Sequence, residues 1–344
     1  MFRFKNNIVH LCYSLLWRKV GIKKMKVALI GGVNSSFVCL QKLKKHNLNI
    51  VKVYGYKPKN TLNVSSYNDL KPFCEKEQIK FNYFEKINDF CDEIQDLNLD
   101  ILFVVGVSQL VNEKIINAAK IGSIGFHPTR LPKGRGRAPI AWLVNELQDG
   151  AATFFVLEKD ADSGGILHQE NFKVKKNDTA KEVEESLLSA MKISLDKLLP
   201  KLIEGWWNPK IQNESEKSEY GARKPNDGLI SWNDSATSIE RLVKAAAHPH
   251  PGAFTFYGSN RLKINNACVE NEINIKGVKG RVLKLNENKC LVQTADGIIW
   301  IEIDNFKSYN IRVGSLFGYK LDLEVFRLKQ EVAKLKKQLK KKND

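Results

Sequence analysis

Short apolar runs alternate with amphipathic segments in the first part of this chain, and this alternation limits the folds that it can adopt. Three of these runs are apolar almost throughout: 26–32 (KVALIGG), 49–56 (NIVKVYGY) and 100–111 (DILFVVGVSQLV). Between the first two, the apolar residues of 34–46 recur at helical spacing. Strands without polar alternation are typical of parallel sheets that helices cover on both faces. We therefore predict an α/β fold with a Rossmann-like parallel sheet.

The rest of the chain divides by composition. A long amphipathic helix is predicted at 179–205, and the polar residues 208–227 are typical of a linker. Short β-like runs separated by turns follow over about 70 residues, which predicts a small OB-like β-barrel. We expect four parts: a basic N-terminal extension at 1–24, an α/β domain at 25–207, a linker with a C-terminal β-barrel domain at 208–318, and a lysine-rich helical tail at 319–344.

The net charge of +17 is concentrated at the two ends of the chain. Residues 1–24 carry six Lys/Arg and no acid, and residues 319–344 carry nine Lys/Arg against four acids, which leaves +6 for the body. A weakly basic body does not favour a nucleic-acid-binding function. We expect 1–24 to be dispensable.

Cysteine spacing and hydropathy indicate the cellular compartment. The six cysteines form no CxxC pair, which predicts a reducing compartment, hence the cytoplasm, and no structural zinc. No apolar run approaches the roughly 20 residues of a membrane-spanning helix.

The C-terminal tail contains apolar residues that alternate spacings of four and three. They are Leu321, Val325, Leu328, Val332, Leu335 and Leu339. This heptad pattern predicts a coiled coil and hence a homodimer through the C-terminal helix. A lone helix that frays in water is the alternative.

Several common chemistries are not favoured. The sequence GGVNSS after the first predicted strand lacks the G-x-G-x-x-G spacing of dinucleotide-binding folds, and no acid follows the second strand. Walker A and H-E-x-x-H motifs are absent from the sequence. The HPHP stretch at 248–251 has no acidic or thiol partner nearby, so we predict a packed turn there and no metal.

One histidine and one aspartate are the candidates for catalysis. His127 ends a predicted strand, and Asp162 follows the next one in a turn. Neighbouring strands could bring both side chains to one edge of the sheet. A carboxylate raises the pKa of an adjacent imidazole, and the pair could then donate a proton or hydrogen bond to a carbonyl oxygen that becomes tetrahedral. A structural role for the two residues is the alternative.

Two motif blocks resemble the folate-dependent formyltransferase family. The first is HPTRLPKGRGRAPI at 127–140 with DADSGGIL at 160–167, which carries the family's His, Ser/Thr, Leu-Pro and Asp-x-Gly pattern. The second is ARKPNDGLISW at 222–232 with IERLVKAAAHPHPGAFTFYG at 239–258, which is similar to the C-terminal domain of methionyl-tRNA and amino-sugar formyltransferases. The resemblance runs from Met25 to Tyr319.

The resemblance implies a reaction and roles for individual residues. An amine would attack the formyl carbon of 10-formyltetrahydrofolate. His127 would stabilise the oxyanion and serve as acid, and Asp162 would hold the histidine and take up the proton. Two arginines, Arg135 and Arg137, could bind anionic groups of donor or acceptor. The residues expected at the folate site are Gly106, Gln109, Thr129, Leu131, Pro132, Leu157 and Asp160.

The sequence departs from the family pattern at one position. The family usually has Asn two residues before the histidine, where its amide helps to hold the oxyanion, and this chain has Gly125. Loss of one such donor lowers the rate by about 10²–10³ in other enzymes. A catalytically decayed homologue that only binds folate or a nucleotide is therefore an alternative of another class.

The absence of an insertion after the second strand predicts which amine accepts the formyl group. In the tRNA-specific enzymes a long basic Gly/Arg segment follows the second strand, whereas 55–73 of this chain is short there and lacks a Gly-Arg-Gly run. We therefore expect the amine of a nucleotide-linked amino sugar as acceptor. Methionyl-tRNA formyltransferase is the alternative enzyme.

Overall fold

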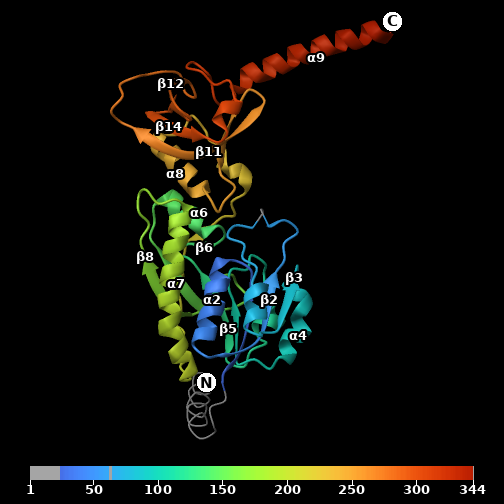
Figure 1. The fold of residues 1–344 in the computed structure, drawn as a ribbon, viewed down its shortest axis with the longest axis vertical. Coiled ribbons are helices and arrows are strands. Elements are labelled where there is room, and N and C mark those ends of the chain that lie inside the picture. Colours follow the sequence, from blue (N-terminus) through green and yellow to red (C-terminus); the bar gives the residue numbers. More distant parts are fainter. Residues whose placement is uncertain (1–23, 62–63, 344) are drawn as a thin grey trace. The chain divides into compact units, whose positions relative to one another are not determined.

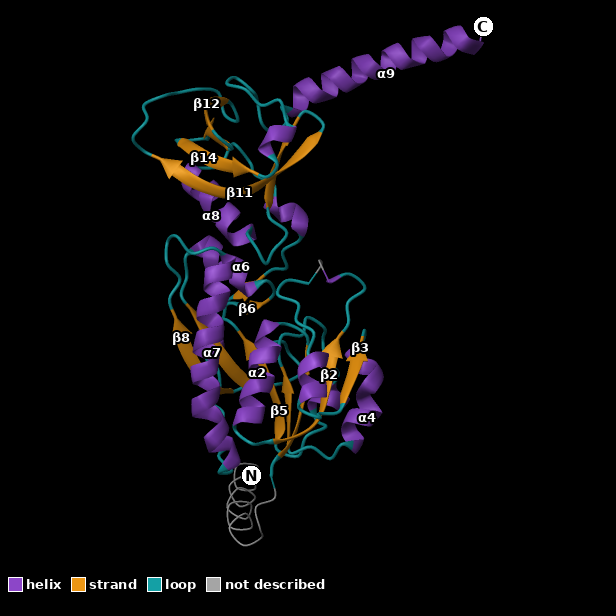
Figure 2. Ribbon diagram, viewed as in Figure 1, coloured by secondary structure: helices purple, strands orange, loops and turns teal. Residues whose placement is uncertain are grey.

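The computed structural model describes residues 24–61 and 64–343 (Figures 1 and 2). The chain forms two compact units. The first extends to Lys224 and also includes His248–Pro251, and the second comprises Pro225–Ala247 and the residues from Gly252 onward. The predicted extension 1–24 lies outside the described residues, except for Lys24.

A seven-stranded sheet forms the centre of the first unit (Figure 2). Its order is β3-β2-β1-β4-β5-β7-β8, and the first five of these strands run parallel. The strands are β1 (Lys26–Gly31), β2 (Asn49–Tyr56), β3 (Phe81–Phe84), β4 (Ile101–Val104), β5 (Gly122–His127), β7 (Gly150–Val156) and β8 (Ile166–Phe172).

The predicted parallel sheet is confirmed for these five strands and wrong for the last two. Strand β7 is antiparallel to both β5 and β8. The short loop 157–165 accounts for the antiparallel pairing of β7 with β8, because a parallel pair needs a crossover long enough to hold a helix.

Helices cover both faces of the sheet, as predicted. Helices α2 and α7 pack side by side (Figure 1), and the buried side chains of α2 include Leu40 and Leu43. Another core cluster joins Ala28 and Ile30 of β1 to helices α4 and α5. The helices of this unit are α2 (Asn34–Lys45), α3 (Lys71–Lys76), η2 (Ile87–Phe90), α4 (Cys91–Asp96), α5 (Glu113–Ile116), α6 (Pro139–Glu146) and α7 (Ala180–Ile203).

Helix α7 begins where the sequence predicts. The Thr179 side chain caps its N-terminus, and the carboxylate of Glu182 accepts the backbone N–H of Thr179 at 2.9 Å. This capping box satisfies backbone N–H groups that the first turn leaves without helical partners.

The segment predicted to be a linker belongs largely to the first unit. It contains η3 (Glu214–Glu216) and β9 (Glu219–Tyr220), and β9 pairs in parallel with β6 (Arg135–Gly136). Backbone hydrogen bonds of 3.0 and 3.1 Å, from Arg135 N to Ser218 O and from Arg137 N to Tyr220 O, hold the two segments together. The polar residues of this segment therefore do not prevent its backbone from pairing with another strand.

The second unit is built on an antiparallel sheet of order β10-β11-β14-β13-β12. Residues 314–318 bond to both edge strands, because Gly314 N donates to Val282 O and Gly318 N donates to Phe256 O. This segment thus links the two edge strands of the sheet. Its elements are η4 (Pro225–Gly228), α8 (Ala236–Ala246), β10 (Ala253–Tyr257), β11 (Asn260–Glu270), β12 (Val282–Asn286), β13 (Lys289–Gln293), β14 (Ile298–Ile303) and η5 (Phe306–Ser308).

The last element described is a long helix, α9 (Leu321–Asn343). None of the helices among the described residues has both the length and the apolar character that crossing a membrane requires.

Candidate active site

Strand order places the candidate site at one end of the sheet. Strand β1 lies between β2 and β4, so the strand order reverses there, and α/β folds bind ligands at the carboxyl ends of strands beside such a point. His127 is the last residue of β5, the neighbour of β4. Gly106 and Gln109 follow the end of β4. Gly106 and Gln109, which are predicted to bind the folate, thus follow a strand that ends at the same end of the sheet as His127.

A backbone carbonyl orients the imidazole of His127. The side chain is buried, and its Nε2 atom lies 2.8 Å from the carbonyl oxygen of Gly134. Thr129 Oγ1 donates to the same oxygen at 3.2 Å. A carbonyl oxygen can only accept a hydrogen bond, so Nε2 carries a proton, and Nδ1 of the neutral ring is the unprotonated nitrogen.

The carboxylate of Asp162 meets the free side of this ring. Its Oδ2 atom lies 3.5 Å from His127 Nδ1 and accepts the backbone N–H of Gly136 at 2.9 Å. Asp162 has a φ of 55°, in the left-handed region that Asp adopts more readily than most residues. The structure therefore brings the two candidate residues together.

The reason for their meeting differs from the prediction. Strand β7 is antiparallel to β5, and its last residue, Val156, pairs with Ile124 rather than with His127. The carboxyl ends of β5 and β7 therefore lie at opposite ends of the sheet. Loop 157–165 carries Asp162 back to the imidazole, and the bond to Gly136 holds it there.

Burial dominates the electrostatics of His127. Removal of the imidazole from water lowers its pKa below the ordinary value of 6.5, against the raising effects of Asp162 and the Gly134 carbonyl. The carboxylate does raise the imidazole pKa, as expected, but the effect of burial is larger. Neutral imidazole is thus the form present at neutral pH.

An asparagine at Gly125 would require the side chains of Phe155 and Leu157 to shift. A Cβ atom built there would lie 2.7 Å from Cζ of Phe155 and 2.8 Å from Cδ2 of Leu157. The side chains of Phe155 and Leu157 fill the space that an asparagine side chain would enter. The glycine is therefore matched to these two neighbours.

Several predicted folate-site residues are already engaged within the protein. The Gln109 amide accepts from Ile87 N at 3.1 Å and donates to Glu85 O at 2.6 Å. Leu131 is buried, and the Pro132 carbonyl accepts from Ser218 N. Gly106 and Asp160 are exposed, and Gln109, Pro132 and Leu157 are partly exposed.

The two predicted anion-binding arginines have different surroundings. Arg137 is exposed. Arg135 is buried, and its guanidinium donates to Glu214 Oε1 at 2.6 Å and to Gln212 Oε1 at 2.8 Å. The charge of Arg135 is thus neutralised inside the protein, and only Arg137 is available to a substrate.

Sequence reasoning missed Gln212, which lies in the segment predicted to be a linker. Its Nε2 atom donates to the carbonyls of Asp162 and Gly164 at 2.8 and 2.7 Å, while its Oε1 accepts from Arg135. Gln212 therefore joins the Asp162 turn to the loop that orients His127. No motif or periodicity marks this residue in the sequence.

The HPHP stretch lies in the first unit. Its His250 Nδ1 is 2.9 Å from Oγ of Ser65, in the loop after β2. Within the described part of the chain, no cluster of three or more His, Cys, Asp or Glu residues could hold a metal ion.

Two family profiles match the chain. The profile described as formyl transferase matches residues 6–198, and the profile of the formyl transferase C-terminal domain matches residues 223–311. The chain belongs to the formyl transferase family. This confirms the resemblance, formyl transfer as the reaction and 10-formyltetrahydrofolate as the family's donor. The first match begins at residue 6, earlier than the resemblance to the family that starts at Met25.

Solved structures of similar fold include sugar and tRNA formyltransferases. The sugar 3N-formyltransferase WlaRD, solved in the presence of dTDP and 5-N-formyl-THF, is 21% identical, with a TM-score of 0.63 over 82% of this chain and 98% of that one. An N-formyltransferase of Helicobacter canadensis, solved with folinic acid and dTDP-3-aminofucose, is 19% identical, with a TM-score of 0.64 over 81% and 100%. Methionyl-tRNA formyltransferase of Clostridium thermocellum is 19% identical, with a TM-score of 0.51 over 72% and 95%.

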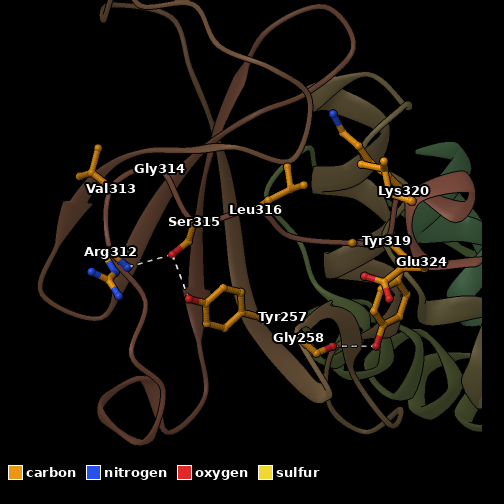
Figure 3. A pocket seen from close by; sticks show the side chains of 12 residues that line it. Tyr257, Gly258, Arg312, Val313, Gly314, Ser315, Leu316, Tyr319, Lys320 and Glu324 are labelled. Atoms are coloured by element: carbon orange, nitrogen blue, oxygen red, sulfur yellow. Dashed lines mark hydrogen bonds between the residues drawn. The ribbon is translucent and has the colours of Figure 1, made fainter. Parts of the chain in front are cut away.

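The second unit contains a cavity of about 510 Å³ (Figure 3). The Ser315 hydroxyl accepts from the backbone N–H of Arg312 and contacts the Tyr257 hydroxyl at its wall. Leu323 and Glu324, from the first turn of α9, also line it. None of the predicted site residues lines this cavity.

Proposed function

We propose that this formyltransferase moves a formyl group from 10-formyltetrahydrofolate to the primary amine of a nucleotide-linked amino sugar. The observation that carries the proposal is the pair of acceptors formed by His127 Nδ1 and Asp162 Oδ2, 3.5 Å apart. Neither acceptor can donate to the other, and the N–H groups of an attacking amine that lies beside the pair can donate to them.

The unprotonated Nδ1 of His127 acts as the general base. It accepts the proton that the amine must lose as the new C–N bond forms. The carboxylate of Asp162 stabilises the imidazolium that results, since an adjacent negative charge favours the protonated ring.

The same nitrogen then acts as the acid. The Nδ1–H of the imidazolium donates to the oxygen of the formyl group while that oxygen is anionic, and it passes its proton to N10 as the C–N10 bond breaks. One amine proton thus ends on N10. The bound donor supplies the electrophilic formyl carbon, and the half-buried, apolar Leu157 beside Gly125 suits a flat pterin ring.

Support for an amino sugar comes from both the loops and the relatives. The loop between β2 and α3 contains no Gly-Arg-Gly run. Two similar structures are of sugar N-formyltransferases solved with dTDP or a dTDP-amino sugar. The exposed guanidinium of Arg137 can bind a phosphate of such a substrate.

The test is an acceptor panel. Purified protein is incubated with 10-formyltetrahydrofolate and either dTDP-linked 3- and 4-amino sugars or methionyl-tRNA, and products are identified by mass spectrometry. We expect one formyl group on a sugar nucleotide.

Two other results would each support one of the alternative functions. Formylation of methionyl-tRNA alone would replace the sugar proposal with the tRNA one. Folate binding without formylation of any acceptor would indicate a catalytically decayed, folate-binding protein.

A further inference from the structure

Helix α9 has an apolar stripe that the described part of the chain does not cover. We call its six apolar residues the seam. Their side chains are 41–73% exposed: Leu321, Val325, Leu328, Val332, Leu335 and Leu339. Spacings of four and three place the three leucines Leu321, Leu328 and Leu335 at heptad position d. Val325, Val332 and Leu339 then occupy position a.

The identities of the seam residues indicate the number of strands. β-Branched residues at a, combined with leucine at d, favour two-stranded coiled coils over trimers and tetramers. Val325 and Val332 supply the first condition, and Leu328 and Leu335 supply the second. A stripe of this kind is complementary to a copy of itself.

The charges beside the seam indicate the orientation. The g positions hold Glu324 and Glu331, and the e positions that follow them by five residues hold Lys329 and Lys336. In a parallel pair, each g residue faces the e residue of the next heptad in the partner, so Glu324 would face Lys329 and Glu331 would face Lys336. In an antiparallel pair, g would face g and e would face e, and like charges would meet.

We propose that α9 pairs with α9 of a second copy of this chain in a parallel, in-register, two-stranded coiled coil. The two copies bury the seam between them, and the Glu331 carboxylate of each copy bonds the Lys336 ammonium of the other. The proposal concerns assembly and does not depend on the acceptor of the formyl group.

Glu331 and Lys336 are the pair to test. The earlier glutamate, Glu324, lines the cavity of Figure 3 and forms an ion pair of 3.0 Å with Arg327 of its own helix, so a change there has more than one effect. Glu331 and Lys336 are exposed on the helix. Lys334, at outward position c, is the matched control.

The charge test uses the full-length chain in sedimentation-velocity and light-scattering measurements over a concentration series. The wild type should show a concentration-dependent monomer–dimer equilibrium. E331K and K336E should each raise the dimer Kd about tenfold, because two attractive contacts per dimer become repulsive. K334E should change it about twofold or less. The double variant E331K/K336E, and an equimolar mixture of the two single variants, should both restore dimerisation.

Orientation is tested separately by cross-linking. With the Leu335→Cys variant, a parallel in-register pair brings the two introduced thiols together, and mild oxidation should give a covalent dimer that the Lys334→Cys control and the wild type do not form. A strictly monomeric wild type, equal effects of K334E and E331K, or a dimer that survives Leu335→Glu would overturn the proposal. Formyl transfer, assayed in parallel, reports on the enzyme proposal alone.

Discussion

The imidazole of His127 and the carboxylate of Asp162 are both positioned by one short loop, 134–136. The carbonyl of Gly134 accepts from His127 Nε2 at 2.8 Å, and the N–H of Gly136 donates to Asp162 Oδ2 at 2.9 Å. The contact between the two side chains themselves is longer, at 3.5 Å. The backbone thus holds both groups, with His127 Nδ1 and Asp162 Oδ2 close to each other but not directly hydrogen-bonded through a well-placed proton.

Removal of either group should abolish most of the activity. We expect His127→Asn and Asp162→Asn each to lower kcat by about 10²-fold or more, because the first removes the general base and the second removes the carboxylate that stabilises its protonated form. Steady-state formylation assays measure the loss, and thermal unfolding checks that the fold is kept.

The chain offers a matched control for this pair. His46 and Asp196 form a second His–Asp contact, at 2.8 Å, between α2 and α7. His46→Asn should leave kcat unchanged. Similar losses at both histidines would contradict a catalytic role for His127.

The ionisation of His127 should respond to Asp162. Burial lowers the imidazole pKa below 6.5, and the carboxylate partly opposes this, so Asp162→Asn should lower the pKa further. NMR titration of the His127 ring in both proteins measures the two values. A higher pKa in the variant would show that the carboxylate does not act on the ring as the structure indicates.

A second histidine should make stability depend on pH. Burial, aided by Arg223 and His248, lowers the pKa of His250 to about 4. Between pH 6.5 and about 4, the unfolded chain binds a proton at this residue that the folded chain does not, so stability is present above pH 6.5 and is lost as pH falls towards 4. The loss from this residue is on the order of 3 kcal/mol.

The variant His250→Gln isolates this contribution. We expect urea unfolding of the variant to depend less steeply on pH over this range than that of the wild type. His168→Gln is a comparison on β8, since the pKa of His168 is also lowered by burial but Glu170 opposes the effect. Parallel pH profiles of wild type and His250→Gln would contradict the prediction.

Local patterns in the sequence predicted the elements but not all of their pairings. The apolar runs predicted the parallel strands and the amphipathic pattern predicted α7, because burial on one or both faces leaves a periodic signal. The direction of β7 and the pairing of β9 with β6 depend on contacts distant in sequence. The candidate pair was found from strand ends, whereas Gln212 acts through hydrogen bonds that no local pattern encodes.

Gly125→Asn should not restore a more active site on its own. The new side chain would press on Phe155 and Leu157, so we expect stability to fall by about 1–3 kcal/mol without a gain in kcat. The double variant Gly125→Asn/Leu157→Ala relieves part of this contact. Chemical unfolding of the two single variants and the double variant should therefore show non-additive effects. Additive losses would mean that Leu157 does not limit the space at Gly125.

Gln212 should act as a positioning residue. It is buried, and its amide ties the carbonyls of Asp162 and Gly164 to the guanidinium of Arg135. Gln212→Ala removes these bonds and leaves buried polar groups without partners, at a cost of about 1–3 kcal/mol in stability.

The kinetic effect of this change separates positioning from mere stability. We expect kcat to fall about tenfold or more with KM little changed, because displacement of Asp162 weakens proton transfer rather than substrate binding. Gln148→Ala is the control, since Gln148 only accepts the hydroxyl of Tyr220 at an exposed position and should leave kcat unchanged. If Gln212→Ala lowers the melting temperature but keeps the wild-type kcat below that temperature, the residue supports the fold and does not position Asp162.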